Sequence, residues 1–197
     1  MSTHEQIATL DERAVGGTSS SVMAMILFVA SEAMFFMAFF GIYTAAQAGQ
    51  RVWPPLSIPL PAMGLPTSGA VVLGLSAIPM ALLVRAVRRG GGKGAGGWLL
   101  LTAALGAAYC VLQLAGYSEL GFGIHDGIYA SLFYIMTGLG LAHVVGGLVF
   151  LGLVSQQALA GELALRRDPA EALAIYWFFV VLLGLALYVA FYAGIAG

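Results

Sequence analysis

Five apolar segments of bilayer-spanning length constrain this chain more than any other feature of its sequence. A transmembrane helix needs roughly 20 apolar residues, and we predict such helices near residues 19–46, 66–88, 96–117, 128–155 and 170–195. Only 9% of the residues are charged, compared with roughly 25% in a soluble domain. We therefore predict an all-α integral membrane bundle of five transmembrane helices, with a polar tail at 1–18 and a single membrane domain at 19–197.

Basic residues are distributed unevenly between the two sides of this five-helix arrangement. Seven of the eight lie on one side, and only Arg51 lies on the other; the seven are Arg13, Arg85, Arg88, Arg89, Lys93, Arg166 and Arg167. The positive-inside rule then predicts a cytoplasmic N-terminus and a C-terminus outside. The net charge of -1 gives no attraction to nucleic acid. The glycine-rich link at 90–94 also lacks the strand and the Lys-Ser/Thr ending of a phosphate-binding loop.

One carboxylate, Glu32, lies inside the first apolar segment. An ionised carboxylate near the bilayer centre costs roughly 2.5–3.5 kcal/mol even on the lower scales, so this side chain must face protein, find a partner or stay protonated. An acid in this position is a candidate functional site. A glutamate can also serve only to hydrogen-bond a neighbouring helix and fix its packing, and both roles stay open here.

His143 is the second ionisable residue well inside a predicted span. At about 1.5 Å per residue, Glu32 lies about 15 Å and His143 about 16 Å from the same side of the membrane. We therefore expect the two side chains to face each other, as a hydrogen bond or as a charge pair, and both are candidates for a role related to protons. Metal ligation by His143 is disfavoured, because a haem or copper site needs further ligands that this sequence does not supply.

Other polar residues are expected to have structural roles. Gln113 and Tyr117 lie one turn apart, so we predict hydrogen bonds from both to a neighbouring helix. Asp126 precedes the fourth predicted helix and is expected to cap it, with a proton or metal role as the alternative. Thr67 and Ser68 are expected to cap the second helix.

Motifs for catalysis are missing from the sequence. The single cysteine, Cys110, has no partner for a disulfide within the chain, and no clustered cysteines or histidines form a metal-binding pattern. Neither a zinc-protease motif nor a nucleophile elbow is present. We predict no catalytic centre and no bound metal in this chain.

Four ordered stretches resemble motifs of subunit III of the haem-copper terminal oxidases, the cytochrome c oxidase type. They are Ser31-Glu32-Ala33-Met34-Phe35-Phe36, Trp53-Pro54-Pro55, Gln113 and Tyr117 followed by Asp126-Gly127-Ile128-Tyr129-Ala130-Ser131-Leu132-Phe133, and Thr137-Gly138 followed by His143-Val144 and Gly147. The likeness extends from the first predicted helix to the last. The chain departs from the family pattern at Gly116 and Gly140, where the family has a glutamate and a histidine. In the last helix, Phe178 and Val181 replace a histidine and an aspartate.

The resemblance implies the shorter, five-helix bacterial form of this subunit, in the inner membrane of the cell. It implies a non-catalytic subunit of a complex that reduces O2 and pumps protons, with haem and copper held by partner subunits I and II. This chain would pack beside subunit I, bind phospholipid in a cleft, support proton uptake and stability, and could join a larger respiratory supercomplex. Glu32 corresponds to the family's membrane glutamate, near the proposed lipid and oxygen-access region.

Two alternatives stay open at this point. The first is the equivalent subunit of a quinol oxidase or of a nitric-oxide-reducing relative, because the electron donor and the substrate are decided on other subunits. The second is a stand-alone proton-coupled transporter that uses Glu32 and His143. The single polar level and the lack of an inverted repeat disfavour the transporter.

Overall fold

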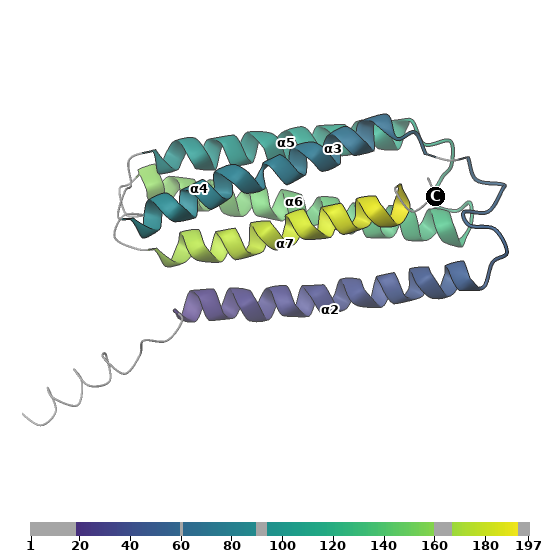
Figure 1. Ribbon diagram of the computed structural model, residues 1–197, viewed down its shortest axis with the longest axis horizontal. Coiled ribbons are helices and arrows are strands. Elements are labelled where there is room, and N and C mark those ends of the chain that lie inside the picture. The colour runs from purple at the N-terminus through teal and green to yellow at the C-terminus, as the bar shows by residue number, and fades with distance from the viewer. Residues whose placement is uncertain (1–18, 60, 90–93, 160–166, 193–197) are drawn as a thin grey trace, which may run out of the picture.

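The computed structural model describes residues 19–59, 61–89, 94–159 and 167–192, and this part of the chain is entirely helical apart from turns and loops (Figure 1). Its helices are α2 (Ser20–Ala48), α3 (Gly64–Leu75), α4 (Ala77–Arg88), α5 (Ala95–Ser118), α6 (Ile128–Leu159) and α7 (Asp168–Phe191). α3 and α4 together make one membrane span, so five spans are long and apolar enough to cross a membrane, and the predicted all-α bundle of five transmembrane helices is confirmed. The predicted tail at 1–18 and the predicted end of the last helix at 195 lie outside the described residues.

α7 occupies the centre of the bundle and α2 lies at its edge (Figure 1). α7 packs against α2, α3, α4 and α6. Half of the α7 span is buried, compared with 11% of the α2 span. We call the end of the bundle where α4 ends and α7 begins the Arg88 end, and the opposite end, which carries the loops after α2 and after α5, the Trp53 end.

α2 is attached to the bundle along one narrow seam. Its buried residues are Val22, Phe36 and Tyr43, and with the half-buried Val29 they recur every seventh position. A seven-residue repeat keeps one stripe of a helix facing its partners, here α6 and α7. The opposite side of α2 is apolar and open, as the 76% exposure of Met34 shows. This face of α2 is therefore available to lipid or to a partner subunit.

The second span is interrupted at Ser76, which the sequence-based prediction of one helix at 66–88 did not foresee. Pro79 has no backbone N–H to donate to the carbonyl of Leu75, and its ring crowds that carbonyl, so the helix breaks near this point. The Ser76 hydroxyl donates to the Leu73 carbonyl at 2.6 Å and accepts from Trp177 Nε1 at 3.0 Å. The break thus places a fully buried polar contact between α3 and α7.

Trp177 is the largest fully buried side chain of the described residues. Its ring lies between two glycines on different helices: a Cβ at Gly106 would come 2.7 Å from Trp177 Cη2, and a Cβ at Gly147 would come 2.8 Å from Cζ3. Both distances are too short for a real side chain. The absence of a side chain at these two positions is therefore what gives the indole its space between α5 and α6.

The predicted caps of the second helix are wrong. α3 begins at Gly64, three residues earlier than Thr67. The hydroxyls of Thr67 and Ser68 therefore lie inside the helix, where they donate to the carbonyls of Met63 and Gly64. Hydroxyl side chains compete for backbone groups in this way when they lie within a helix rather than at its start.

An aromatic cluster closes the Trp53 end. Trp53 Nε1 donates to the Tyr43 hydroxyl at 3.0 Å, and this hydroxyl donates to the Ala190 carbonyl at 2.9 Å. The Trp53 ring also packs edge-on against Tyr129. The loop after α2 is therefore bonded to α2 and, through Tyr43, to the end of α7.

Replacing Tyr43 with phenylalanine should destabilise this end of the bundle by about 1 kcal/mol, because two hydrogen bonds lose their shared hydroxyl while the ring packing is kept. Denaturant titration in mixed micelles, followed by circular dichroism, measures the loss. Tyr188→Phe, which removes one bond to the exposed Thr67, is the milder comparison. Equal stability of Tyr43→Phe and wild type would contradict the role given to Tyr43.

Candidate functional site

Glu32 on α2 and His143 on α6 meet inside the membrane-spanning part of the bundle. His143 Nε2 lies 3.1 Å from Glu32 Oε2. The predicted contact between the two side chains is confirmed, and the depth calculation was sufficient to find it. The pair also joins the peripheral helix α2 to the rest of the protein.

The second ring nitrogen of His143 fixes where a proton must lie. Nδ1 is 2.8 Å from the carbonyl oxygen of Leu139, and a carbonyl can only accept, so Nδ1 carries a hydrogen. The contact between Nε2 and the Glu32 carboxyl then needs one further proton, either on the carboxyl or on Nε2. In both arrangements the pair has no net charge, which lowers the cost of placing it in a membrane.

Aromatic side chains surround this pair. Phe36 and Phe179 both pack edge-on against the His143 ring, with ring centroids 5.3 and 6.3 Å away. From α7, the Tyr176 hydroxyl donates to the backbone carbonyl of His143 at 2.9 Å. The side chain of Glu32 is 24% exposed and that of His143 is 15% exposed. The pair is therefore mostly covered by protein but still accessible from outside the bundle.

An apolar groove of about 200 Å³ runs beside the pair, between α2 and α7. Phe36 and Phe179 line it, and these are the two rings that pack on His143. The other lining side chains include Met37 and Leu182, both open to the outside of the bundle. The groove is therefore open to the outside of the bundle and is separated from the pair by the rings of Phe36 and Phe179.

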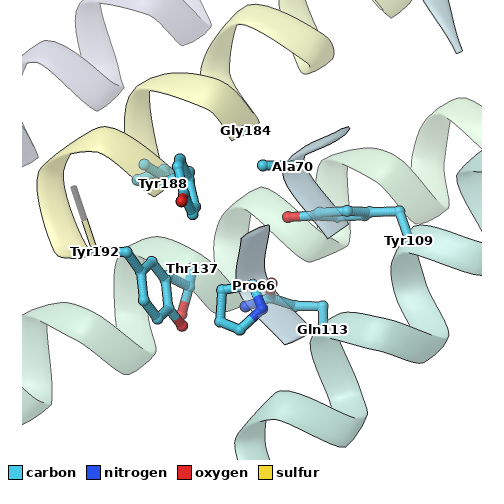
Figure 2. Close-up of a pocket in the computed structure, with 9 residues that line it drawn as sticks. Pro66, Ala70, Tyr109, Gln113, Thr137, Gly184, Tyr188 and Tyr192 are labelled. Atoms are coloured by element: carbon cyan, nitrogen blue, oxygen red, sulfur yellow. The ribbon is translucent and has the colours of Figure 1, made fainter. Parts of the chain in front are cut away.

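Gln113 and Tyr117 differ in what they contact. The Tyr117 hydroxyl donates to Thr137 Oγ1 on α6 at 2.9 Å, so its predicted bond to a neighbouring helix is confirmed. The side chain of Gln113 bonds to no other residue in the described ranges. It lines a small cavity among α3, α5, α6 and α7 (Figure 2).

Asp126 does not cap the helix that follows it. Its Oδ2 accepts from the backbone N–H of Gly123 at 2.6 Å, and in the described part of the chain this carboxylate bonds to no N–H of α6. Gly127, which separates Asp126 from α6, has a φ of +119°. This backbone conformation, which favours glycine, turns the chain at this point, so the carboxylate closes its own loop.

Two of the polar contacts that were not predicted from the sequence join α7 to the second span. One is the buried bond between Trp177 and Ser76, which Pro79 could have indicated by predicting a helix break next to a serine. The other is an ion pair at the Arg88 end, where Arg88 Nε donates to Glu171 Oε1 at 2.9 Å. Its residues occupy the last turn of α4 and the first turn of α7, which were predicted to lie on the same side of the membrane.

Taken together, these features define a class: a polytopic membrane protein with a Glu–His pair inside its membrane-spanning helices. Within residues 19–59, 61–89, 94–159 and 167–192 no three metal-ligating side chains gather into a possible metal site. A model of the family described as cytochrome c oxidase subunit III matches residues 12–194. The chain belongs to the cytochrome c oxidase subunit III family.

Individual relatives agree with this assignment. The chain is 34% identical over 176 residues to cytochrome c oxidase subunit 3 of Lycodon semicarinatus, which covers 85% of this chain and 67% of that protein. It is 28% identical over 173 residues to the protein of the same name from Thermostichus vulcanus, covering 87% and 86%. The protein of this name from Xenopus laevis is 33% identical over 174 residues, covering 85% and 67%.

One departure from the family's motifs has a local explanation. A Cβ at Gly140, where the family pattern has a histidine, would lie 2.7 Å from Leu187 Cδ1 on α7. Leu187 is buried, with an exposure of 3%. Leucine at 187 and glycine at 140 therefore fit together, and a histidine could enter only if α7 or Leu187 moved.

Proposed function

We propose that this chain is the non-catalytic subunit that stabilises an oxidase complex and helps to keep its proton supply fast, with Glu32 and His143 as the residues of that role. The observation that carries the proposal is the contact between these two side chains inside the membrane. A carboxyl and an imidazole in contact inside a membrane are suited to a role in proton supply, because either group can carry the proton that they share. Haem and copper chemistry would belong to the partner subunits.

We place the chain next to subunit I, and near subunit II, in a bacterial inner membrane. The outward apolar face of α2, which includes Met34 and Met37, supports such a contact, because a large exposed apolar face marks an interface or a lipid surface. Arg85, Arg88 and Arg89 lie together at the Arg88 end and support a cytoplasmic location for it. Arg13, Lys93 and Arg166, which belong to the same argument, lie outside the described residues.

Phospholipid binding is the third part of the proposal. A cavity of about 330 Å³ opens at the Arg88 end, with apolar walls that include Val22, Ile175 and Phe178. Arg88 and Glu171 also line this cavity. A guanidinium has five N–H donors, of which Glu171 uses one, so Arg88 is suited to hold a lipid phosphate while the acyl chains lie against the apolar walls.

Arg88→Gln should lower the amount of phospholipid that remains with the complex in mild detergent, because glutamine cannot attract a phosphate by charge. Mass spectrometry of the extracted lipids measures the change. Arg51→Gln, at the opposite end of the bundle, is the matched control and should retain the wild-type amount. Equal lipid in both variants would remove Arg88 from the proposed site.

Purification through a tag on this chain tests the proposal as a whole. After mild detergent extraction, we expect haem bands in the reduced-minus-oxidised spectrum and larger oxidase subunits by mass spectrometry. The haem types would then identify the branch of oxidases. A colourless, solitary chain from intact membranes would contradict the accessory role.

A further inference from the structure

The cavity that Gln113 lines is bordered by polar side chains as well as apolar ones. It has a volume of about 20 Å³, and its polar lining consists of Tyr109, Gln113, Thr137, Tyr188 and Tyr192. Tyr109 and Gln113 reach into it from α5, opposite Tyr188 and Tyr192 at the end of α7 (Figure 2). Four helical segments thus contribute to one small space.

Three of these polar groups have hydrogen-bonding capacity that the described protein does not use. Thr137 donates to the Phe133 carbonyl, and the Tyr188 hydroxyl bonds to Thr67. The hydroxyls of Tyr109 and Tyr192 and the amide of Gln113, by contrast, have no partner among the described side chains and backbone groups. A glutamine amide alone offers two donors and two acceptor positions.

Native proteins rarely leave such groups without a partner. Within the described ranges, every fully enclosed side-chain nitrogen or oxygen atom is hydrogen-bonded. The unpartnered oxygen and nitrogen atoms of Tyr109, Gln113 and Tyr192 are therefore not fully enclosed by protein atoms. They border space that a water molecule can enter. This property separates the cavity from a packing defect, which would have apolar walls and stay dry.

The size and the position of the cavity fit water. About 10–15 Å³ of such volume is enough for one molecule, and an enclosed water typically makes two to four hydrogen bonds. Gln113 lies five residues before the end of α5, and Tyr192 directly follows α7. At about 1.5 Å per residue, the cavity is within roughly two turns of the Trp53 end, so water can reach it without crossing the centre of the membrane.

We propose that this cavity is a hydration site, in which a water molecule bonds to the Tyr109 and Tyr192 hydroxyls and to the Gln113 amide and so connects α5 to α7. The water completes contacts that the protein alone leaves open. It also explains why Gln113 does not make the direct bond to a neighbouring helix that its position predicts. This site is separate from the Glu32–His143 pair, and the proposal does not depend on the function proposed for that pair.

X-ray radiolysis of the intact oxidase complex, followed by mass spectrometry, tests the site, because radicals formed from a bound water oxidise the rings next to it. Tyr176 is the control for Tyr109, since both are 8% exposed and the Tyr176 hydroxyl donates to a backbone carbonyl. Tyr43, at 6%, is the control for Tyr192, at 5%. We expect oxidation of Tyr109 and Tyr192 to exceed that of their controls several-fold.

Gln113→Leu provides the second arm. It should lower the oxidation of Tyr109 several-fold, whereas Leu114→Ala, on the exposed side of the same helix, should leave it unchanged. Oxidation of Tyr109 and Tyr192 at the level of their controls in the wild-type complex would overturn the proposal, even if Gln113→Leu fails to assemble. Undiminished oxidation of Tyr109 in an assembled Gln113→Leu complex would also overturn it, because the water would not be held by Gln113.

Discussion

Trp177→Ala is expected to lower the free energy of unfolding by about 3–5 kcal/mol, the range for removing a fully buried tryptophan. The indole has no exposed surface and fills the space between Gly106 and Gly147. Its removal leaves a cavity at the centre of the bundle and also takes away the donor that bonds to Ser76. Neither glycine has a side chain that could refill the space.

Denaturant titration in mixed micelles, followed by circular dichroism, measures this loss without relying on tryptophan fluorescence. Trp177→Phe is the matched control, because it keeps an aromatic ring and loses mainly the hydrogen bond, with an expected cost of about 1–3 kcal/mol. Ser76→Ala should reproduce part of the Trp177→Phe effect. A loss below about 1 kcal/mol for Trp177→Ala would mean that the helices close around the missing ring.

Glu32→Ala is expected to destabilise the chain by on the order of 1–3 kcal/mol, because it leaves a small cavity and removes the partner of His143 Nε2. Glu32→Gln should have a smaller effect, since the amide can still donate to that nitrogen. Haem absorbance of the assembled complex should be the same in both variants. Neither substitution removes a metal ligand.

Retention of this chain in the purified complex, measured on a temperature series, compares the two variants. Ser31→Ala is the neighbouring control, because the Ser31 hydroxyl bonds only within α2, to the Phe28 carbonyl. We expect loss at lower temperature for Glu32→Ala alone. A loss of haem from the Glu32→Gln complex would contradict the accessory role given to this pair.

Most of the fold could be predicted because, in a membrane, backbone N–H and C=O groups have no water to bond to. They must form hydrogen bonds within their own helix. Apolar length decides where helices form, and the five spans follow from it. The break at Ser76 did not follow from length, because Pro79 lies within a segment that is apolar throughout. The caps of the second helix were predicted wrongly, because the hydroxyls of Thr67 and Ser68, a type of side chain typical of helix starts, bond to backbone carbonyls inside α3 instead.

The ionisable pair could be predicted because depth in the membrane can be compared between residues that are far apart in sequence. Glu32 and His143 are at one level, and each needs a partner. Gln113 offered no such constraint, since an amide can bond to protein or to water at similar energy. The space that holds the Trp177 ring depends on glycines from two other helices. Sequence spacing does not show which glycines face which helix.

The single shared proton of the Glu32–His143 pair has a consequence for how the protein responds to an energised membrane. A transmembrane voltage acts on net charge, at about 2.3 kcal/mol per elementary charge for every 100 mV crossed in full. While Glu32 and His143 hold one proton between them, the voltage exerts no net force on the pair, and moving that proton from oxygen to nitrogen costs little electrical work. Gain of an additional proton, or loss of the shared one, would create a charge part-way through the field. Proton exchange at this pair should therefore depend on voltage, whereas the contact itself should not.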